Sequence, residues 1–104
     1  MEMKYSDPVD FIREKLGQEE LLAQLAEECV ELSKAALKLR RVYSGINPTP
    51  VKRSEAFKNL KEEIADVSLC LEVLGMNTPM VMREVHQTMN MKLERWALRL
   101  EETE

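Results

Sequence analysis

The sequence predicts an all-α fold. Two long stretches repeat apolar residues at alternating intervals of three and four, whereas no stretch alternates apolar and polar residues as a half-buried strand does. Helix breakers are few and fall at Gly17, at residues 44–50 (SGINPTP) and at residues 75–79 (GMNTP). With 104 residues, 33% charged and 44% hydrophobic, the chain is expected to form one globular domain, residues 1–104, containing four helices.

The first two predicted helices are separated by a single glycine. Asp7 followed by Pro8 is typical of an N-cap and first helical residue, so a short helix is expected from there to about Leu16. A long second helix is predicted from about Gln18 to Tyr43. Its apolar row is spaced three, four, three, four, as in a helix that packs on another helix: Leu22, Leu25, Cys29, Leu32, Ala36, Leu39 and Tyr43.

The third and fourth helices lie on either side of the second breaker. A third helix is predicted from about Lys52 to Leu74, and Thr78 followed by Pro79 repeats the cap signature and opens a fourth helix that reaches about Leu100. The third helix carries a row of the same spacing as the second: Phe57, Leu60, Ile64, Val67, Leu71 and Leu74.

These helices are expected to form a four-helix-bundle-like domain built on an antiparallel hairpin, because the connection between the two long helices is short. Residues 67–76 (VSLCLEVLGM) are apolar almost all round, interrupted by Ser68 and Glu72. A chain of 12.1 kDa cannot easily bury such a stretch alone. A homodimer or homotetramer is therefore predicted, with this stretch in the interface.

Composition narrows the classes of partner. The formal net charge is −4 and the calculated pI is about 5.2, which argues against binding a nucleic-acid polymer. The first ten residues, MEMKYSDPVD, hold no apolar signal core, and no run of about 18 apolar residues could cross a membrane. Cys29 and Cys70 lack metal-type spacing and are expected to be reduced, buried thiols in a cytoplasmic protein.

Two acidic motifs carry the candidate chemistry. EECVEL and EEIADV each place two carboxylates three residues apart on one helix face: Glu28 with Glu31, and Glu63 with Asp66. Both pairs lie on the same side of their apolar row, and an antiparallel hairpin turns these sides toward each other. The pairs are also equidistant from residue 47, in the connection. All four carboxylates are therefore expected at the same level along the hairpin.

Four like charges in one place must be protonated or hold a cation. Oxygen ligands favour Mg²⁺ or Mn²⁺. Solvated acids paired with Lys34, Lys58 or Lys61 are the ordinary alternative for each motif taken alone. A di-iron carboxylate site is excluded, because it needs two Glu-x-x-His motifs and the only histidine, His86, has Arg83 three residues before it.

The contexts LAEECVELSKAALKL and NLKEEIADVSLCLEVL resemble the MazG-like family of all-α nucleoside triphosphate pyrophosphohydrolases, over about residues 20–100. The resemblance implies hydrolysis of a nucleoside triphosphate to the monophosphate and pyrophosphate, in nucleotide-pool house-cleaning. It implies that Glu28, Glu31, Glu63 and Asp66 hold Mg²⁺. One acid among Glu27, Glu28 and Glu31 would orient or deprotonate the attacking water.

Phosphates also need cations from the protein. Lys92 and Arg95, in the MKLERW stretch, resemble the basic pair that the family carries late in its last helix, and they are predicted to bind the triphosphate. Gln24, one turn before Glu28, is a candidate for reading a base edge. Trp96 is a candidate for stacking on the base, with core or interface packing as its alternative.

Two other classes of function stay open. One is a catalytically silent helical dimer that binds a nucleotide or a protein. The other is a plain helical interaction module whose acidic residues are solvated.

Overall fold

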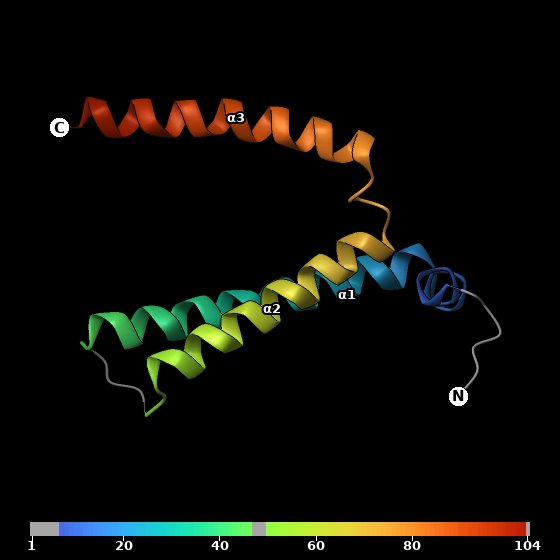
Figure 1. The fold of residues 1–104 in the computed structure, drawn as a ribbon, viewed down its shortest axis with the longest axis horizontal. Helices are drawn as coiled ribbons and strands as arrows, with labels where there is room; N and C mark the ends of the chain where they lie inside the picture. Colours follow the sequence, from blue (N-terminus) through green and yellow to red (C-terminus); the bar gives the residue numbers. More distant parts are fainter. Residues whose placement is uncertain (1–6, 47–49, 104) are drawn as a thin grey trace. The chain divides into compact units, whose positions relative to one another are not determined.

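The computed structural model describes residues 7–46 and 50–103. These residues form three helices and no strand: α1 (Pro8–Ser44), α2 (Arg53–Val73) and α3 (Pro79–Glu102) (Figure 1). The predicted all-α class is confirmed. Among the described residues, none of the helices combines the length and the apolar character that a membrane span requires. The chain divides into two units, Met1–Leu74 and Gly75–Glu104, which are described separately.

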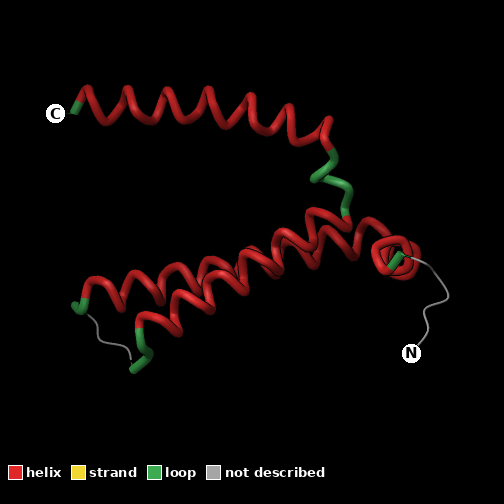
Figure 2. The backbone as a smooth tube through the Cα atoms, viewed as in Figure 1, coloured by secondary structure: helices red, strands yellow, loops and turns green. Residues whose placement is uncertain are grey.

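A sharp corner divides α1 at Gly17. Asp7 caps the helix, because its Oδ1 accepts a hydrogen bond from the Val9 amide at 2.9 Å, and Pro8 is the first helical residue. At Gly17 the backbone leaves the helical region, with φ 75° and ψ 168°. Figure 2 shows the result: the segment before Gly17 is viewed almost end-on, while the rest of α1 lies across the page. The predicted break between the first two helices is confirmed.

The long part of α1 and the whole of α2 form an antiparallel hairpin and lie side by side (Figure 1). Gly45 ends α1 in the left-handed conformation, at φ 68°, and its amide donates to the Arg41 carbonyl at 3.0 Å. At the end of the hairpin where the connection joins α1 to α2, the Arg53 guanidinium lies 4.2 Å from the centroid of the Tyr43 ring. The predicted hairpin is therefore confirmed.

The seam of the hairpin is the set of buried and half-buried side chains between α1 and α2. Ala35 and Ala56 are almost fully buried and lie level with each other in the antiparallel register, so that their small side chains let the two helices approach closely. The seam residues follow one another at alternating intervals of four and three. They are Leu21, Leu25, Glu28, Leu32, Ala35 and Leu39 from α1, and Ala56, Leu60, Glu63, Val67, Cys70 and the C-cap Leu74 from α2.

The predicted apolar rows were therefore wrong in half of their positions. Leu25, Leu32 and Leu39 do lie in the seam, as do Leu60, Val67 and Leu74. The other predicted positions lie one residue beyond the seam. Leu71 is half-buried there, and the rest are exposed: Leu22, Cys29, Ala36 and Tyr43 in α1, and Phe57 and Ile64 in α2. Both helices carry two adjacent apolar rows, so that spacing alone does not choose between them.

The cysteines illustrate the difference between the two rows. Cys70 is buried in the seam, as predicted, whereas Cys29 is exposed, so the prediction that it is buried was wrong. Both are free thiols. The predicted all-round burial of residues 67–76 is also only partly met within this chain, because Val73 is buried but Leu69 is 53% exposed.

Arg13 fastens the short N-terminal segment of α1 to the end of α2. Its Nε donates to the Val73 carbonyl at 2.6 Å and its Nη2 to the Glu72 carbonyl at 3.2 Å. Asp10 lies 3.7 Å from the same guanidinium. The last carbonyls of a helix lack partners within the helix and carry partial negative charge, which a guanidinium can satisfy. Arg13 thus caps α2 and holds residues 8–16 against the hairpin.

In the second unit, α3 is a single amphipathic helix. Thr78 caps it through a hydrogen bond accepted from the Val81 amide at 3.4 Å, and Pro79 is its first residue, as predicted. None of its described residues is buried. Its exposed apolar side chains include Met89, Leu93 and Trp96.

Candidate functional site

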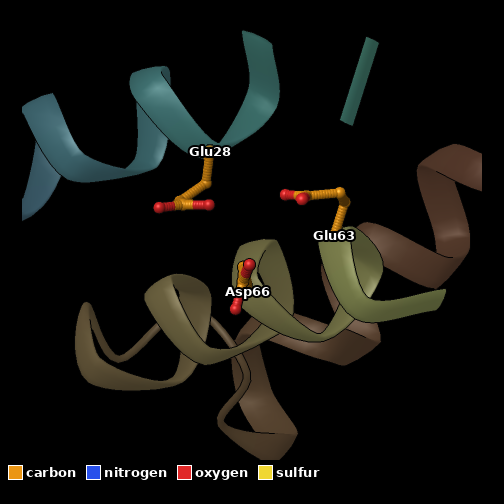
Figure 3. A group of neighbouring side chains, drawn as sticks. All are labelled: Glu28, Glu63 and Asp66. Carbon is orange, nitrogen blue, oxygen red and sulfur yellow. The ribbon is translucent and has the colours of Figure 1, made fainter. Parts of the chain in front are cut away.

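Three carboxylates meet across the seam of the hairpin. Glu28 comes from α1, and Glu63 and Asp66 come from α2 (Figure 3). Each offers a ligand oxygen, and these oxygens all lie within 4.8 Å of one another. Glu28 and Glu63 are half-buried, and Asp66 is exposed. We call these three residues the carboxylate cluster.

The cluster lies in the seam rather than beside it. The sequence placed Glu28 and Glu63 on the flank of an apolar row, and this was wrong, because the hairpin packs through the neighbouring row. Glu28 occupies the position between Leu21 and Ala35, and Glu63 the position between Ala56 and Cys70. Two acidic residues thus take the places that apolar residues hold at the other levels of the seam.

This environment raises the pKa of Glu63. Partial desolvation in the seam is the largest cause, and the negative charges of Asp66, Glu28, Glu31 and Glu62 act in the same direction. Desolvation and like charges also raise the pKa of the neighbouring Cys70 thiol, since Glu28 and Asp66 both disfavour a thiolate. The field at this point of the seam is therefore negative and would favour a cation.

On α1, both Glu28 and Glu31 contact a polar side chain of the same helix. Gln24 Nε2 donates a hydrogen bond of 3.0 Å to Glu28 Oε1, one helical turn away. Glu31 lies outside the cluster and is exposed, and its Oε1 pairs with Lys34 Nζ at 3.4 Å. It is still close enough to contribute to the raised pKa of Glu63. The structure thus brings together three of the four predicted metal ligands and places the fourth nearby.

The donor set fits a hard divalent cation. All the ligand atoms are carboxylate oxygens, with neither sulfur nor imidazole among them, which suits Mg²⁺ or Mn²⁺. Three carboxylates are too few to fill an octahedral shell, so that water or phosphate oxygens would complete it. His86 is exposed on α3, outside this group.

The other predicted site residues divide between the two units. Glu27 is exposed on α1 and is not part of the carboxylate cluster. Lys92, Arg95 and Trp96 are exposed on α3 and line one surface hollow together with Arg99. Lys92, Arg95 and Arg99 therefore form a basic stripe on one side of α3. Its role toward phosphates stays a prediction.

An open pocket of about 180 Å³, which the sequence did not reveal, adjoins the cluster. Its apolar walls come from the N-terminal segment and from both helices of the hairpin: Ile12, Leu16, Leu21, Leu69 and Val73. Gln24, Glu28 and Asp66 line it as well, so it shares two residues with the cluster. The signal in the sequence was the spacing of Ile12 and Leu16, which share a helix face just before the Gly17 corner.

No protein-family model, curated protein or solved structure matches this chain.

Proposed function

We propose that the chain is a Mg²⁺-dependent nucleoside triphosphate pyrophosphohydrolase that converts a nucleoside triphosphate to the monophosphate and pyrophosphate. The observation that carries the proposal is the convergence of Glu28, Glu63 and Asp66 from two helices, with ligand oxygens within 4.8 Å of one another. The two motifs that supply these residues are those that resemble the MazG-like family. Clearing unwanted nucleotides from the pool is the cellular role that follows.

The reaction is the attack of water on the α-phosphorus. The bond from that phosphorus to the oxygen it shares with the β-phosphate breaks, and pyrophosphate leaves. Bound Mg²⁺ would draw phosphate oxygens toward the cluster and neutralise the charge that develops on them. Glu28, Glu63 and Asp66 would hold it, with Glu31 as a further ligand. Gln24 keeps the Glu28 carboxylate in place through its hydrogen bond.

An acid at the edge of the cluster would orient the attacking water and take its proton. Glu28 and Glu31 both lie close enough to Glu63 to raise its pKa, whereas Glu27 is exposed and is not among the causes of that shift. Glu28 and Glu31 are therefore the two candidates for this role.

Substrate binding and assembly complete the proposal. Gln24 would contact the base, since it lies one turn before Glu28. The predicted roles of Lys92 and Arg95 toward the triphosphate, and of Trp96 toward the base, rest on the resemblance and on the composition of α3. We further propose that the chain forms a homodimer or homotetramer. Exposed apolar side chains on the hairpin support assembly, among them Leu22, Phe57 and Ile64.

The same exposed apolar side chains favour the second candidate, a catalytically silent helical dimer that binds a nucleotide or a protein. Pyrophosphate release separates the two. The wild-type chain is incubated with each of the common ribo- and deoxyribonucleoside triphosphates in Mg²⁺, and pyrophosphate is measured. Release that depends on both Mg²⁺ and Glu63 supports the hydrolase. Absence of release with every nucleotide, from protein that is folded by circular dichroism, supports the silent dimer.

A further inference from the structure

Positive charge is concentrated at the end of the hairpin where the connection joins α1 to α2 (Figure 1). Residues 32–54 carry six of the 15 basic residues of the chain and none of its 19 acidic ones. The nearest acids along the chain are Glu31, before this stretch, and Glu55, after it. A chain whose net charge is −4 therefore has one end that is locally positive. We call this end the basic end, and it consists of Lys38, Arg40, Arg41, Lys52 and Arg53.

Helix stability accounts for only part of this charge. Arg41 lies in the last turn of α1, where a cation compensates the partial negative charge of the last carbonyls. Lys52 and Arg53 lie at the start of α2, where the helix dipole makes a cation unfavourable. In the part of the chain that the structure describes, no ion pair involves Arg40, Arg41 or Lys52. These charges are therefore available to an anionic group of another molecule.

Two of the arginines line a surface hollow of about 320 Å³ on α1. Its lining residues are Leu37, Arg40, Arg41, Ser44 and Ile46. Leu37 and Arg41 each follow a seam residue by two positions, about 200° round the helix, so the hollow faces away from α2. Leu37 is 52% exposed and Ile46 is 89% exposed. The hollow thus presents apolar side chains next to two guanidinium groups.

We propose that the basic end and this hollow bind a short acidic segment of another protein, in which acidic residues flank an apolar one. Its carboxylates would pair with Arg40 and Arg41, and its apolar side chain would pack on Leu37 and Ile46. Arg40 lies about 18 Å along α1 from Glu28, so this surface is separate from the carboxylate cluster. The proposal is independent of the proposed hydrolysis.

A peptide fits this surface better than a nucleic acid does. The positive stretch is bounded by Glu31 on α1 and by Glu55 on α2. A long phosphate backbone that bound the basic end would therefore continue onto negatively charged surface. Phosphates also make no use of the exposed Leu37 and Ile46 side chains, whereas an apolar peptide side chain buries part of their surface.

The test measures the binding of two fluorescently labelled peptides by anisotropy, without nucleotide or metal. One peptide is a short run of glutamates with two leucines at its centre. In the other, serines replace the leucines, so that the charge is the same. The leucine peptide should bind the wild-type chain, with an affinity that falls as the salt concentration rises. The serine peptide should bind about fivefold more weakly or worse, because the apolar contact is lost.

Arg40→Glu and Ile46→Ser test the two parts of the surface. Both side chains are exposed, so the variants should keep the fold, which circular dichroism checks. The Kd of the leucine peptide should rise by about tenfold or more in Arg40→Glu and by about fivefold in Ile46→Ser. Arg83→Glu is the control, with the same change in net charge at an exposed position of α3, and should leave this Kd unchanged.

Several results would overturn the proposal. One is the absence of binding between the leucine peptide and the folded wild-type chain. Others are equal Kd values for the two peptides, an unchanged Kd in Ile46→Ser, or equal Kd values for Arg40→Glu and Arg83→Glu. Tighter binding of single-stranded oligouridylate, or of vesicles of phosphatidylserine and phosphatidylcholine, would assign the basic end to a nucleic acid or to a membrane surface instead.

Discussion

At the scale of single residues, Glu63 has the most informative environment. It sits in the seam between Ala56 and Cys70, in a position where an apolar side chain would pack. Its pKa is raised by partial desolvation and by the carboxylates around it. A protein keeps such an arrangement at a cost to its metal-free stability. A divalent cation would remove that cost, because it compensates the charges that repel one another.

Replacing Glu63 should separate metal binding from folding. Glu63→Gln keeps the shape of the side chain and removes one negative charge from the cluster. Mg²⁺ should then raise the melting temperature less than in the wild type, and kcat/KM should fall by at least about 100-fold, since loss of even an outer partner of a metal site costs 10–100-fold. Glu62→Gln is the control, with the same change in net charge at an exposed neighbour. Equal activity of the two variants would contradict the metal site.

The raised pKa of Glu63 also predicts a pH dependence of stability. In the metal-free protein the folded state binds the Glu63 proton more tightly than the unfolded chain. The free energy of unfolding should therefore fall as pH rises from the ordinary glutamate pKa through the raised value. The measurement is the urea midpoint as a function of pH, compared between wild type and Glu63→Gln. The wild type should lose more stability than the variant on going to neutral pH, and saturating Mg²⁺ should reduce this difference.

At the scale of elements, the main feature is the corner at Gly17, which separates the short N-terminal segment of α1 from the rest of the helix. Gly17 adopts φ 75° and ψ 168°, a region in which residues with a Cβ are strained. The space around it is open, because an added Cβ would meet no heavy atom within 4 Å. The requirement for glycine at this corner is therefore one of backbone conformation and not of packing.

Gly17→Ala tests this corner. The substitution should destabilise the native state by about 1–3 kcal/mol, the usual cost of a side chain in this region of backbone space. Alternatively the helix runs straight through residue 17 and residues 8–16 leave the hairpin. Urea unfolding measures the stability, and hydrogen exchange of the residue 8–16 amides reports the position of the segment. Unchanged stability together with unchanged exchange would show that the corner is not strained.

At the scale of the whole molecule, both units carry many exposed apolar side chains. On the hairpin they form the row one residue beyond the seam, and Phe57 and Ile64 are 46% and 48% exposed. The acids Glu31 and Asp66 are on the opposite flank of the seam, because the heptad positions of the two sets lie on opposite sides of it. An assembly through the apolar row would thus leave the carboxylate cluster accessible.

Self-association through this row predicts a sensitivity to Phe57. Phe57→Ser should weaken a dimer by about tenfold or more in Kd, as expected for the loss of an aromatic side chain from an interface. Lys58→Ser, at the adjacent exposed position, should leave the assembly unchanged. Sedimentation equilibrium over a range of protein concentrations measures both. A wild-type chain that stays monomeric at every concentration would rule the assembly out.

Local features were the most predictable from the sequence. The cap-and-proline pairs at residues 7–8 and 78–79 act through hydrogen bonds within a few residues, so that both helix starts are found as predicted. The break at Gly17 is also local. The level at which Glu28 meets Glu63 follows from counting residues to the connection, because an antiparallel hairpin pairs positions equidistant from its turn.

The sequence by itself therefore determined the helices, their breaks and the level at which the acids of α1 and α2 meet. Only the tertiary structure decided which of two adjacent apolar rows packs, and so whether Glu28 and Glu63 lie beside the seam or within it. It also decided that residues 8–16 fold back to form a pocket beside them. The physical reason is that burial is nearly non-directional, so two apolar rows compete on nearly equal terms. The fit of small side chains such as Ala35 and Ala56 then selects between them.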